Sequence, residues 1–217
     1  VVWNARGLLL EGAAMTVALA VATMALAIPP EHVAALLREA RGFPGAAAVR
    51  GLTVAYVEIF RSTPLLIQIY WAFYVMPVAF GIRLSPIETG LTGLVLNVAA
   101  YNSETFRAGI QSIRVGQLRA GLALGMTSAQ TFRIVVFPQA LRRVLPALAT
   151  TWVSLFKDTS LVSIIAVADL SYVALQLRAQ TFRVFEFVTA MAALYWLMGY
   201  PQALVVDWLN RRFKVTE

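Results

Sequence analysis

Two ionisable residues of opposite charge stand side by side after an apolar run. They are Lys157 and Asp158, and Thr159 and Ser160 follow them. An ammonium beside a carboxylate could bind the carboxylate and the amine of a zwitterion such as an amino acid. The two charges could equally neutralise each other at a membrane boundary. The residue types alone leave both roles open.

Arg61 is a second candidate, because a helix break is predicted just after it. Pro64 has no N–H, so it leaves the carbonyl of Phe60 without a helical donor. A broken helix at membrane depth is often a ligand or gating site, and Arg61 and Thr63 border this break. Arg61 could instead reach the lipid headgroups or pair with Glu58 on the same helix face.

A polar stripe is the third candidate. Asn97, Tyr101 and Glu104 are spaced four and then three residues apart, which puts them on one face of a helix. Polar side chains within a membrane usually face a cavity or one another. The stripe could therefore line a path, or it could make hydrogen bonds between helices.

The residues that are missing exclude several kinds of chemistry. Cysteine is absent and His32 is the only histidine, which leaves little for metal binding or histidine-based catalysis. No G-x-S-x-G motif supports an intramembrane serine protease. No G-x-x-x-x-G-K-S/T loop could cradle nucleotide phosphates. His32 itself follows Pro29-Pro30 and is predicted to be an exposed loop residue.

The composition indicates the solvent in which these residues act. Apolar residues make up 59% of the 217 residues and charged residues 13%. Soluble domains have about 25% charged residues, so a soluble enzyme or a disordered chain is excluded and a lipid bilayer is the fitting solvent. The net charge of +7 could indicate nucleic-acid binding in a soluble protein. Here it indicates basic cytoplasmic loops, and no nucleic-acid partner is expected.

The apolar runs predict an all-α membrane protein with about five transmembrane helices, in a single domain over residues 1–217. The predicted spans are residues 8–28, 52–80, 87–108, 140–156 and 185–209. Pro29-Pro30 should kink or end the first, with the helical pattern resuming at 33–37. Residues 161–177 are predicted to form a short helix or a re-entrant piece, with Asp169 at a helix start or in a gate contact.

The basic residues predict the orientation. With the C-terminus inside, twelve arginines and lysines fall on the cytoplasmic side, Arg41 and Lys214 among them, and four fall outside. Cytoplasmic loops carry the excess of such residues. We therefore expect the N-terminus outside, the C-terminus inside, and a long cytoplasmic segment at about 114–138.

That segment is too polar to span a membrane. Gly116 and Gly125 interrupt it, and a helix start is expected at Thr127 or Ser128. Two short helices joined at Gly125 are predicted. They could lie on anionic lipid as an interfacial amphipathic element. They could also dock into a groove on a cytoplasmic partner.

The spacing of this segment resembles the EAA loop of ABC importer permeases. That pattern is Glu-Ala-Ala, three residues, Gly, nine residues, Ile, one residue, Leu-Pro. The matching positions are Arg119, Ala120, Gly121, Gly125, Val135 and Pro138. Segments 56–66, 100–113, 138–142 and 157–162 resemble the polar amino-acid branch of the same superfamily. The resemblance covers residues 12–213.

The resemblance implies a bacterial inner-membrane permease for polar amino acids that works within a complex. Its partners would be a cytoplasmic ATPase dimer that holds ATP and Mg, a second permease that is identical or homologous, and an external substrate-binding protein. Because this chain binds no nucleotide, it would be a transport subunit and not an enzyme, with no cofactor of its own. The alternative is a channel or secondary carrier that needs no ATPase.

The resemblance also assigns residues. The loop residues expected to couple to the ATPase are Arg119, Ala120, Gly121, Gly125, Met126, Val135 and Pro138. The resemblance also favours a place along the substrate path for Asp158 and Ser160. The helix break and the polar stripe described above add Arg61, Thr63, Asn97, Tyr101 and Glu104 to the residues expected along this path. The chain departs from the family pattern at two positions. Arg119 replaces a glutamate that would help to seat the loop on the ATPase, and Gly121 replaces an alanine.

Overall fold

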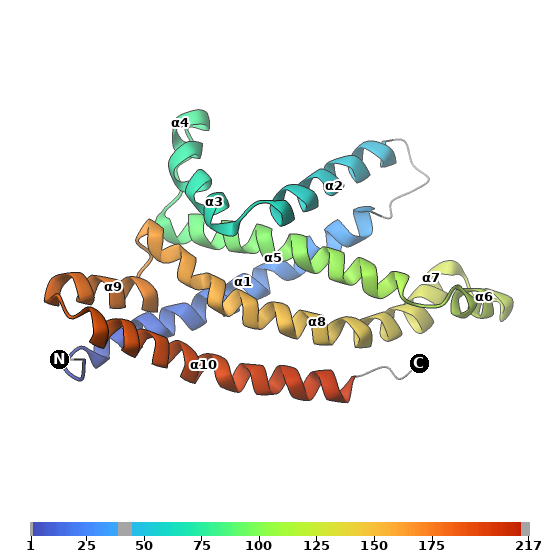
Figure 1. The fold of residues 1–217 in the computed structure, drawn as a ribbon. Helices are drawn as coiled ribbons and strands as arrows, with labels where there is room; N and C mark the ends of the chain where they lie inside the picture. Colours follow the sequence, from blue (N-terminus) through green and yellow to red (C-terminus); the bar gives the residue numbers. More distant parts are fainter. Residues whose placement is uncertain (1, 39–44, 214–217) are drawn as a thin grey trace.

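The computed structural model describes residues 2–38 and 45–213, and the described residues form helices and turns without a strand (Figure 1). Arg41 and Lys214, counted above for the orientation, lie outside these ranges. The α-helices are α1 (Arg6–Arg38), α2 (Ala46–Ser62), α3 (Leu65–Tyr70), α4 (Met76–Phe80), α5 (Pro86–Gln111), α6 (Val115–Ala123), α7 (Ser128–Thr131), α8 (Phe137–Asp158), α9 (Leu170–Thr181) and α10 (Val184–Arg212). Two π-helical turns (Trp71–Val75 and Phe132–Val136) and a 3₁₀ helix (Thr159–Ile165) connect some of them.

Four long helices, α1, α5, α8 and α10, form an elongated bundle (Figure 1). Helix α1 packs most extensively on α5, and α5 packs on α8. The main core cluster joins α1, α5 and α8 to α3 and the 3₁₀ helix through buried residues such as Leu19, Ile69, Leu94, Leu155 and Val162. The α6–α7 segment projects beyond one end of the bundle, and α4 and α9 lie towards the other end.

Helix α1 continues through Pro29-Pro30 to Arg38, so of the two predicted effects of the prolines, a kink or an end, the end is not observed, and residues 33–37 are helical as predicted. A proline inside a helix costs about 3 kcal/mol or more. Packing offsets this cost, because Glu31 is buried beyond the prolines and accepts a hydrogen bond of 2.7 Å from Asn102 of α5.

His32 is also not in a loop, contrary to the prediction. It lies within α1, and its Nδ1 atom is 2.7 Å from the carbonyl oxygen of Ile28 one turn earlier. Its ring contacts the ring of Phe106 at a centroid distance of 4.3 Å. The lone histidine therefore helps to hold the last turns of α1 against α5.

The break predicted at Pro64 is present. Thr63 is extended (φ −106°, ψ 142°), and α2 meets the α3–α4 arm at an angle of 109°. A residue before proline is biased towards this extended conformation. The second apolar run is therefore two helices in a V rather than one straight span.

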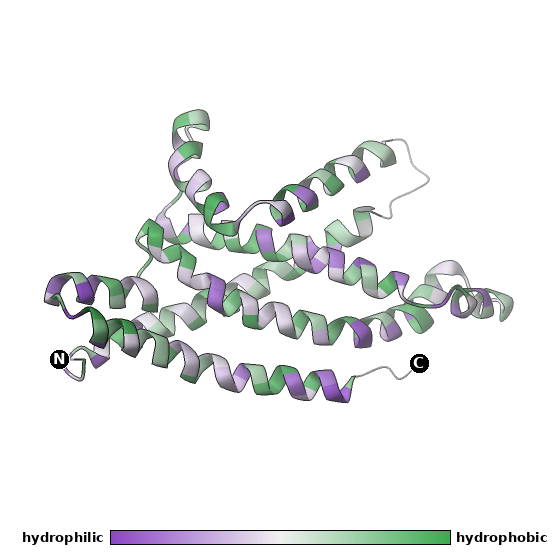
Figure 2. Cartoon of the chain, viewed as in Figure 1, coloured by the Kyte–Doolittle hydropathy of each residue, from purple (hydrophilic) through white to green (hydrophobic). Residues whose placement is uncertain are grey.

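Four of the five predicted spans lie within single helices, and the second is divided at the break. Several of these helices are not apolar enough to be identified as membrane spans by hydropathy alone. Length and hydropathy single out α1 over Arg6–Ala35 as able to cross a bilayer as one straight helix. Two bent helix pairs could each cross as a broken span, which gives up to three. Figure 2 shows hydrophilic residues interspersed along α5 and α8 and at the C-terminal end of α10.

The segment after α8 contains the predicted helix start at Asp169. Its fully buried carboxylate caps α9 by accepting hydrogen bonds from the backbone N–H groups of Ser171 and Tyr172. The hydroxyl of Tyr195 on α10 donates to the same carboxylate at 3.2 Å. This prediction is confirmed, and the cap ties α9 to α10.

Candidate functional site

Side-chain amides stabilise the break between α2 and α3. Because Pro64 cannot donate, the carbonyl of Phe60 accepts hydrogen bonds from Nε2 of Gln68 at 2.9 Å and Nδ2 of Asn97 at 3.1 Å. Nε2 of Gln68 also lies 3.0 Å from the carbonyl oxygen of Thr63, and Oε1 of Gln68 accepts from Asn97. A single glutamine thus bridges both sides of the break.

Two tyrosines tie the end of α2 to α5. The hydroxyl of Tyr101 donates to the carbonyl of Arg61 at 3.3 Å, and that of Tyr56 donates to the carbonyl of Leu96 at 2.7 Å. The guanidinium of Arg61 lies 5.6 Å from the centre of the Tyr101 ring, within the range of a cation–π contact. Arg61 and Glu58 form no ion pair, so that alternative is not observed.

A cavity of about 370 Å³ lies between this break, α5 and α8. It brings together four of the predicted path residues, Thr63, Asn97, Tyr101 and Asp158. Asp158 is half-buried, and within the described part of the chain its carboxylate is in no ion pair and no side-chain hydrogen bond. An unpaired carboxylate at this position could accept a cationic group from a ligand.

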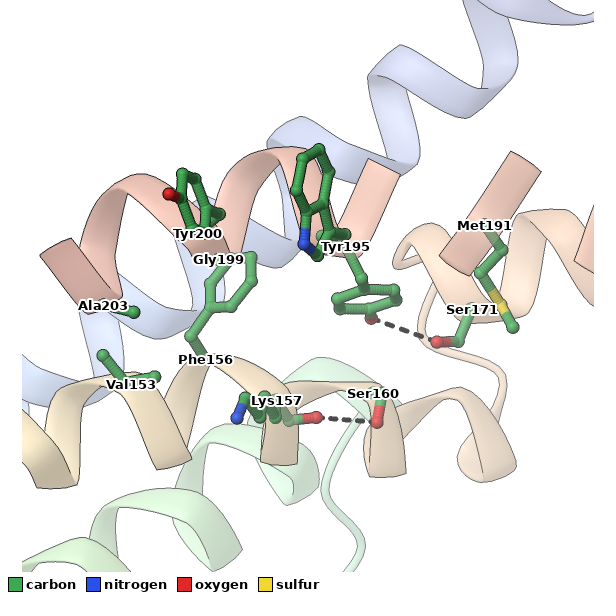
Figure 3. Close-up of a pocket in the computed structure, with 11 residues that line it drawn as sticks. Val153, Phe156, Lys157, Ser160, Ser171, Met191, Tyr195, Gly199, Tyr200 and Ala203 are labelled. Carbon is green, nitrogen blue, oxygen red and sulfur yellow. Dashed lines mark hydrogen bonds between the residues drawn. The ribbon is translucent and has the colours of Figure 1, made fainter. Parts of the chain in front are cut away.

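Lys157 and Ser160 do not share this cavity. They line a separate space of about 530 Å³ between α8, α9 and α10, with Phe156, Tyr195 and Trp196 among its walls (Figure 3). Consecutive residues on a helix point about 100° apart, which separates Lys157 from Asp158. The side chains of Lys157 and Asp158 therefore line different cavities, and Ser160 lies with Lys157 rather than with Asp158.

Glu104 also falls outside the cavity. It is in a salt bridge with Arg107, one helical turn further along α5. Asn97 lines the cavity, but its amide donates to the Phe60 carbonyl between helices, which was the alternative interpretation of the stripe. The polar stripe therefore contributes Tyr101 to the wall and Asn97 mainly to the support of the break.

The sequence interpretation missed several cavity residues. Thr151 and Ser154 of α8 lie seven and four residues before Asp158, and Thr150 lies beside Thr151. This helical spacing put Thr151 and Ser154 on the face of Asp158 and could have revealed them. Gln68 had a weaker signal, since only its position one turn after Pro64 suggested that it could reach the freed carbonyl.

The predicted coupling loop is a rigid helical corner. Gly125 has a left-handed φ of +81° just after α6. The N–H of Met126 donates to the carbonyl of Gly121, and the N–H of Gly125 donates to the carbonyl of Leu122. This pair of bonds is the Schellman motif that ends many helices, and it favours glycine at the left-handed position.

The second arm of the loop starts at the predicted place. The hydroxyl of Thr127 accepts from the N–H of Gln130, and Oε1 of Gln130 accepts from the N–H of Thr127. This capping box starts α7 at Ser128. The arm is not a separate short helix, however, because it passes through the π-helical turn into α8.

The two arms touch at Gly121. A Cβ atom at this position would lie 2.5 Å from Cγ2 of Thr131, closer than real Cβ contacts come. The glycine that departs from the family pattern thus permits the close approach of α6 to α7. Of the other predicted coupling residues, Arg119, Ala120 and Pro138 are exposed, whereas Met126 and Val135 are partly covered.

Known proteins resemble this chain over most of its length. The family model described as "Binding-protein-dependent transport system inner membrane component" matches residues 43–215. The glutamine transport system permease protein GlnP of Escherichia coli K12 is 34% identical over 99% of this chain and 96% of its own length. The L-cystine transport system permease protein TcyB of Bacillus subtilis is 39% identical over 76% of this chain and 70% of its own length.

A solved structure agrees with these sequence relatives. A crystal structure of an amino acid ABC transporter with histidines aligns with a TM-score of 0.90 and 30% identity, over 97% of this chain and 96% of that chain. Similarity of this extent in sequence and in fold establishes the family. The chain belongs to the inner membrane components of binding-protein-dependent transport systems.

Proposed function

We propose that this chain is the permease subunit of an ATP-driven importer for polar amino acids. Its relatives named above carry glutamine or L-cystine transport in their names, and the similar crystal structure is of an amino acid transporter with histidines. The observation that carries the proposal is the polar cavity between the α2–α3 break, α5 and α8, with the unpaired carboxylate of Asp158 in its wall.

Asp158 pairs with the ammonium group of the amino acid as the substrate passes. The guanidinium of Arg61, held near the rim over the Tyr101 ring, attracts its carboxylate. Asp158 in the cavity wall and Arg61, which lies beside Tyr101 but outside the cavity lining, together select a zwitterion over a simple ion. Thr63 and the hydroxyls of Thr151 and Ser154 provide neutral polar contacts along the wall.

The chain spans the bacterial inner membrane five times as a single domain, with its N-terminus outside and its C-terminus in the cytoplasm. Helices α5 and α10 have 26 and 29 residues, which at 1.5 Å per residue is about 39 and 44 Å. Both are long enough to cross a hydrocarbon core of about 30 Å. Their polar faces are covered by the neighbouring helices and by a second permease.

The energy comes from a partner. The loop at 114–138 docks on a cytoplasmic ATPase dimer, which holds ATP and Mg and closes when ATP binds. The movement passes through α7 into α8, which carries Asp158, so that the cavity opens alternately to the two sides. An external binding protein delivers the substrate, and the chain binds no cofactor of its own.

Purification from native membranes in mild detergent, with mass spectrometry of the co-purifying chains, tests this proposal. We expect stoichiometric recovery of an ATPase that carries a nucleotide-binding loop, together with a second permease, either identical or different. Recovery of this chain alone, as a stable homo-oligomer, would refute the proposal and support an ATPase-independent channel or carrier.

A further inference from the structure

The projecting end of the coupling loop exposes large apolar side chains. Leu124 at the corner is 81% exposed and Ile134 in the second arm is 61% exposed. Val115 and Leu122 of α6 are also exposed. Helix caps fix the shape of this corner, and its exposed apolar side chains favour burial against another surface.

The charged residues of the same surface are all basic. Residues 105–156 contain six arginines and no aspartate or glutamate. Arg119 and Arg133 are exposed on the two arms, and neither is in an ion pair within the described part of the chain. Any carboxylate that neutralises them must therefore come from outside this segment.

The position of Arg119 indicates whether the surface that faces the loop is lipid or protein. Arg119 lies four residues after Val115 and three before Leu122, so it is on the exposed apolar face of α6. A helix that lies on lipid separates its apolar face from its cations. Here the cation lies among the apolar residues, which suits a protein groove with a carboxylate at a fixed position.

We propose that the coupling loop fits a groove that is apolar at its centre and bears carboxylates at the positions facing Arg119 and Arg133. The inference rests on the proposed function, since the groove is on the cytoplasmic ATPase. The inference adds that the groove is acidic, so that its negative charge complements the arginines of this loop. An ATPase with a basic groove, suited to a loop with glutamate at position 119, would bind this chain poorly.

A charge series at Arg119 tests the proposal. The permease is reconstituted in nanodiscs of phosphatidylcholine, and the ATPase that co-purifies with the wild-type chain is titrated onto it. We expect Arg119→Glu to weaken binding at least tenfold and Arg119→Lys to bind nearly as the wild type does. Arg133→Glu on the other arm should also weaken binding. Arg83→Glu, an exposed charge reversal between α4 and α5, is the matched control and should change nothing.

The possible outcomes distinguish a failure of the acidic-groove proposal from a failure of the proposed function. If Arg119→Glu and Arg133→Glu bind as tightly as the wild type, the acidic groove is wrong although the loop still docks. If the charge effect appears only when phosphatidylglycerol is added, anionic lipid is the partner and the proposal fails. If no ATPase binds the wild-type chain, the proposed function itself fails. Unchanged elution and melting of the variants exclude misfolding as the cause.

Discussion

At the scale of single residues, Asp158 carries most of the predicted chemistry. It is the acidic residue in the cavity wall and has no partner among the described residues. Hydrogen bonds to charged groups contribute about 1.5–3 kcal/mol, which is a factor of about 10 to 150 in affinity. We therefore expect Asp158→Asn to raise the KM for amino-acid uptake by at least tenfold, as measured in proteoliposomes, while the complex still assembles.

The control for this prediction is Asp207→Asn. Asp207 lies exposed near the end of α10 and is absent from the residues that line the cavity. It should leave the KM unchanged. An Asp158→Asn variant with the uptake constants of the wild type would show that Asp158 has only a structural role.

Gly121 gives a second prediction at this scale. A methyl group there would lie 2.5 Å from Cγ2 and 2.8 Å from Oγ1 of Thr131, and overpacking of this kind costs about 1–3 kcal/mol. Gly121→Ala should lower the melting temperature of the purified complex and the amount of ATPase retained. Adding Thr131→Ala should restore part of the loss.

Gly116→Ala in the same helix is the matched control. A Cβ atom at Gly116 meets no heavy atom within 4 Å, so this change should be neutral or slightly stabilising. If Gly121→Ala and Gly116→Ala give the same melting temperature and retain the same amount of ATPase, the close contact between the loop arms does not contribute to stability or docking.

Residue types alone predicted much of the cavity and misplaced the rest. Asp158, Thr63 and Tyr101 were found because charge, helix breaks and helical spacing can be recognised in one chain. Ser160 and Glu104 do not line this cavity, because the cavity that a side chain faces depends on how the helices pack. Helical geometry alone predicts that Lys157 and Asp158 point about 100° apart, but the packing of α9 and α10 on α8 creates the separate cavity that Lys157 lines.

At the scale of elements, the two proline sites show when a local signal decides the structure. At Pro64 the helix breaks, and the amides of Gln68 and Asn97 satisfy the freed carbonyl. At Pro29-Pro30 the helix continues, because α1 packs on α5 on both sides of the prolines and Glu31 bonds to Asn102. Proline removes a helical hydrogen bond at both sites, and tertiary contacts determine whether the helix breaks there.

The role of Gln68 can be tested through the angle between α2 and α4. Gln68→Met keeps the length of the side chain but removes its hydrogen bonds to the carbonyls of Phe60 and Thr63, which leaves Asn97 as the side-chain donor to Phe60. A typical hydrogen bond contributes about 0.5–1.5 kcal/mol. The chain has no cysteine, so spin labels can be placed at Leu52 and Val78, which are 73% and 87% exposed. We expect the distance distribution between them to broaden in Gln68→Met and the uptake rate to fall.

Gln180→Met on the exposed surface of α9 provides the control and should leave the distribution narrow. A Gln68→Met variant with the same distribution as the wild type would mean that the proline alone holds the break.

At the scale of the whole molecule, the proposed orientation places the coupling loop and the turn before α10 on opposite sides of the membrane. Leu124 in the loop and Phe182 in that turn are 81% and 89% exposed. In intact spheroplasts a membrane-impermeant maleimide should modify Phe182→Cys at once and Leu124→Cys only after permeabilisation. The cysteine-free parent gives the background. The reverse pattern of labelling would overturn the orientation.

The sequence predicts the overall architecture better than it predicts the angles between helices. Apolar runs located the long helices, and their basic flanks suggested the orientation, because a bilayer imposes both features on any chain that crosses it. The V of α2 with the α3–α4 arm was predictable only as a break, since its angle depends on packing against α5.

The most direct test of the central claim is transport by the purified complex. The permease, its ATPase and its binding protein are reconstituted in proteoliposomes, and uptake of radiolabelled polar amino acids is measured with ATP and with a non-hydrolysable analogue. We expect accumulation against a gradient that requires both ATP hydrolysis and this chain. Equal uptake with and without hydrolysable ATP, ending at equilibrium, would contradict it.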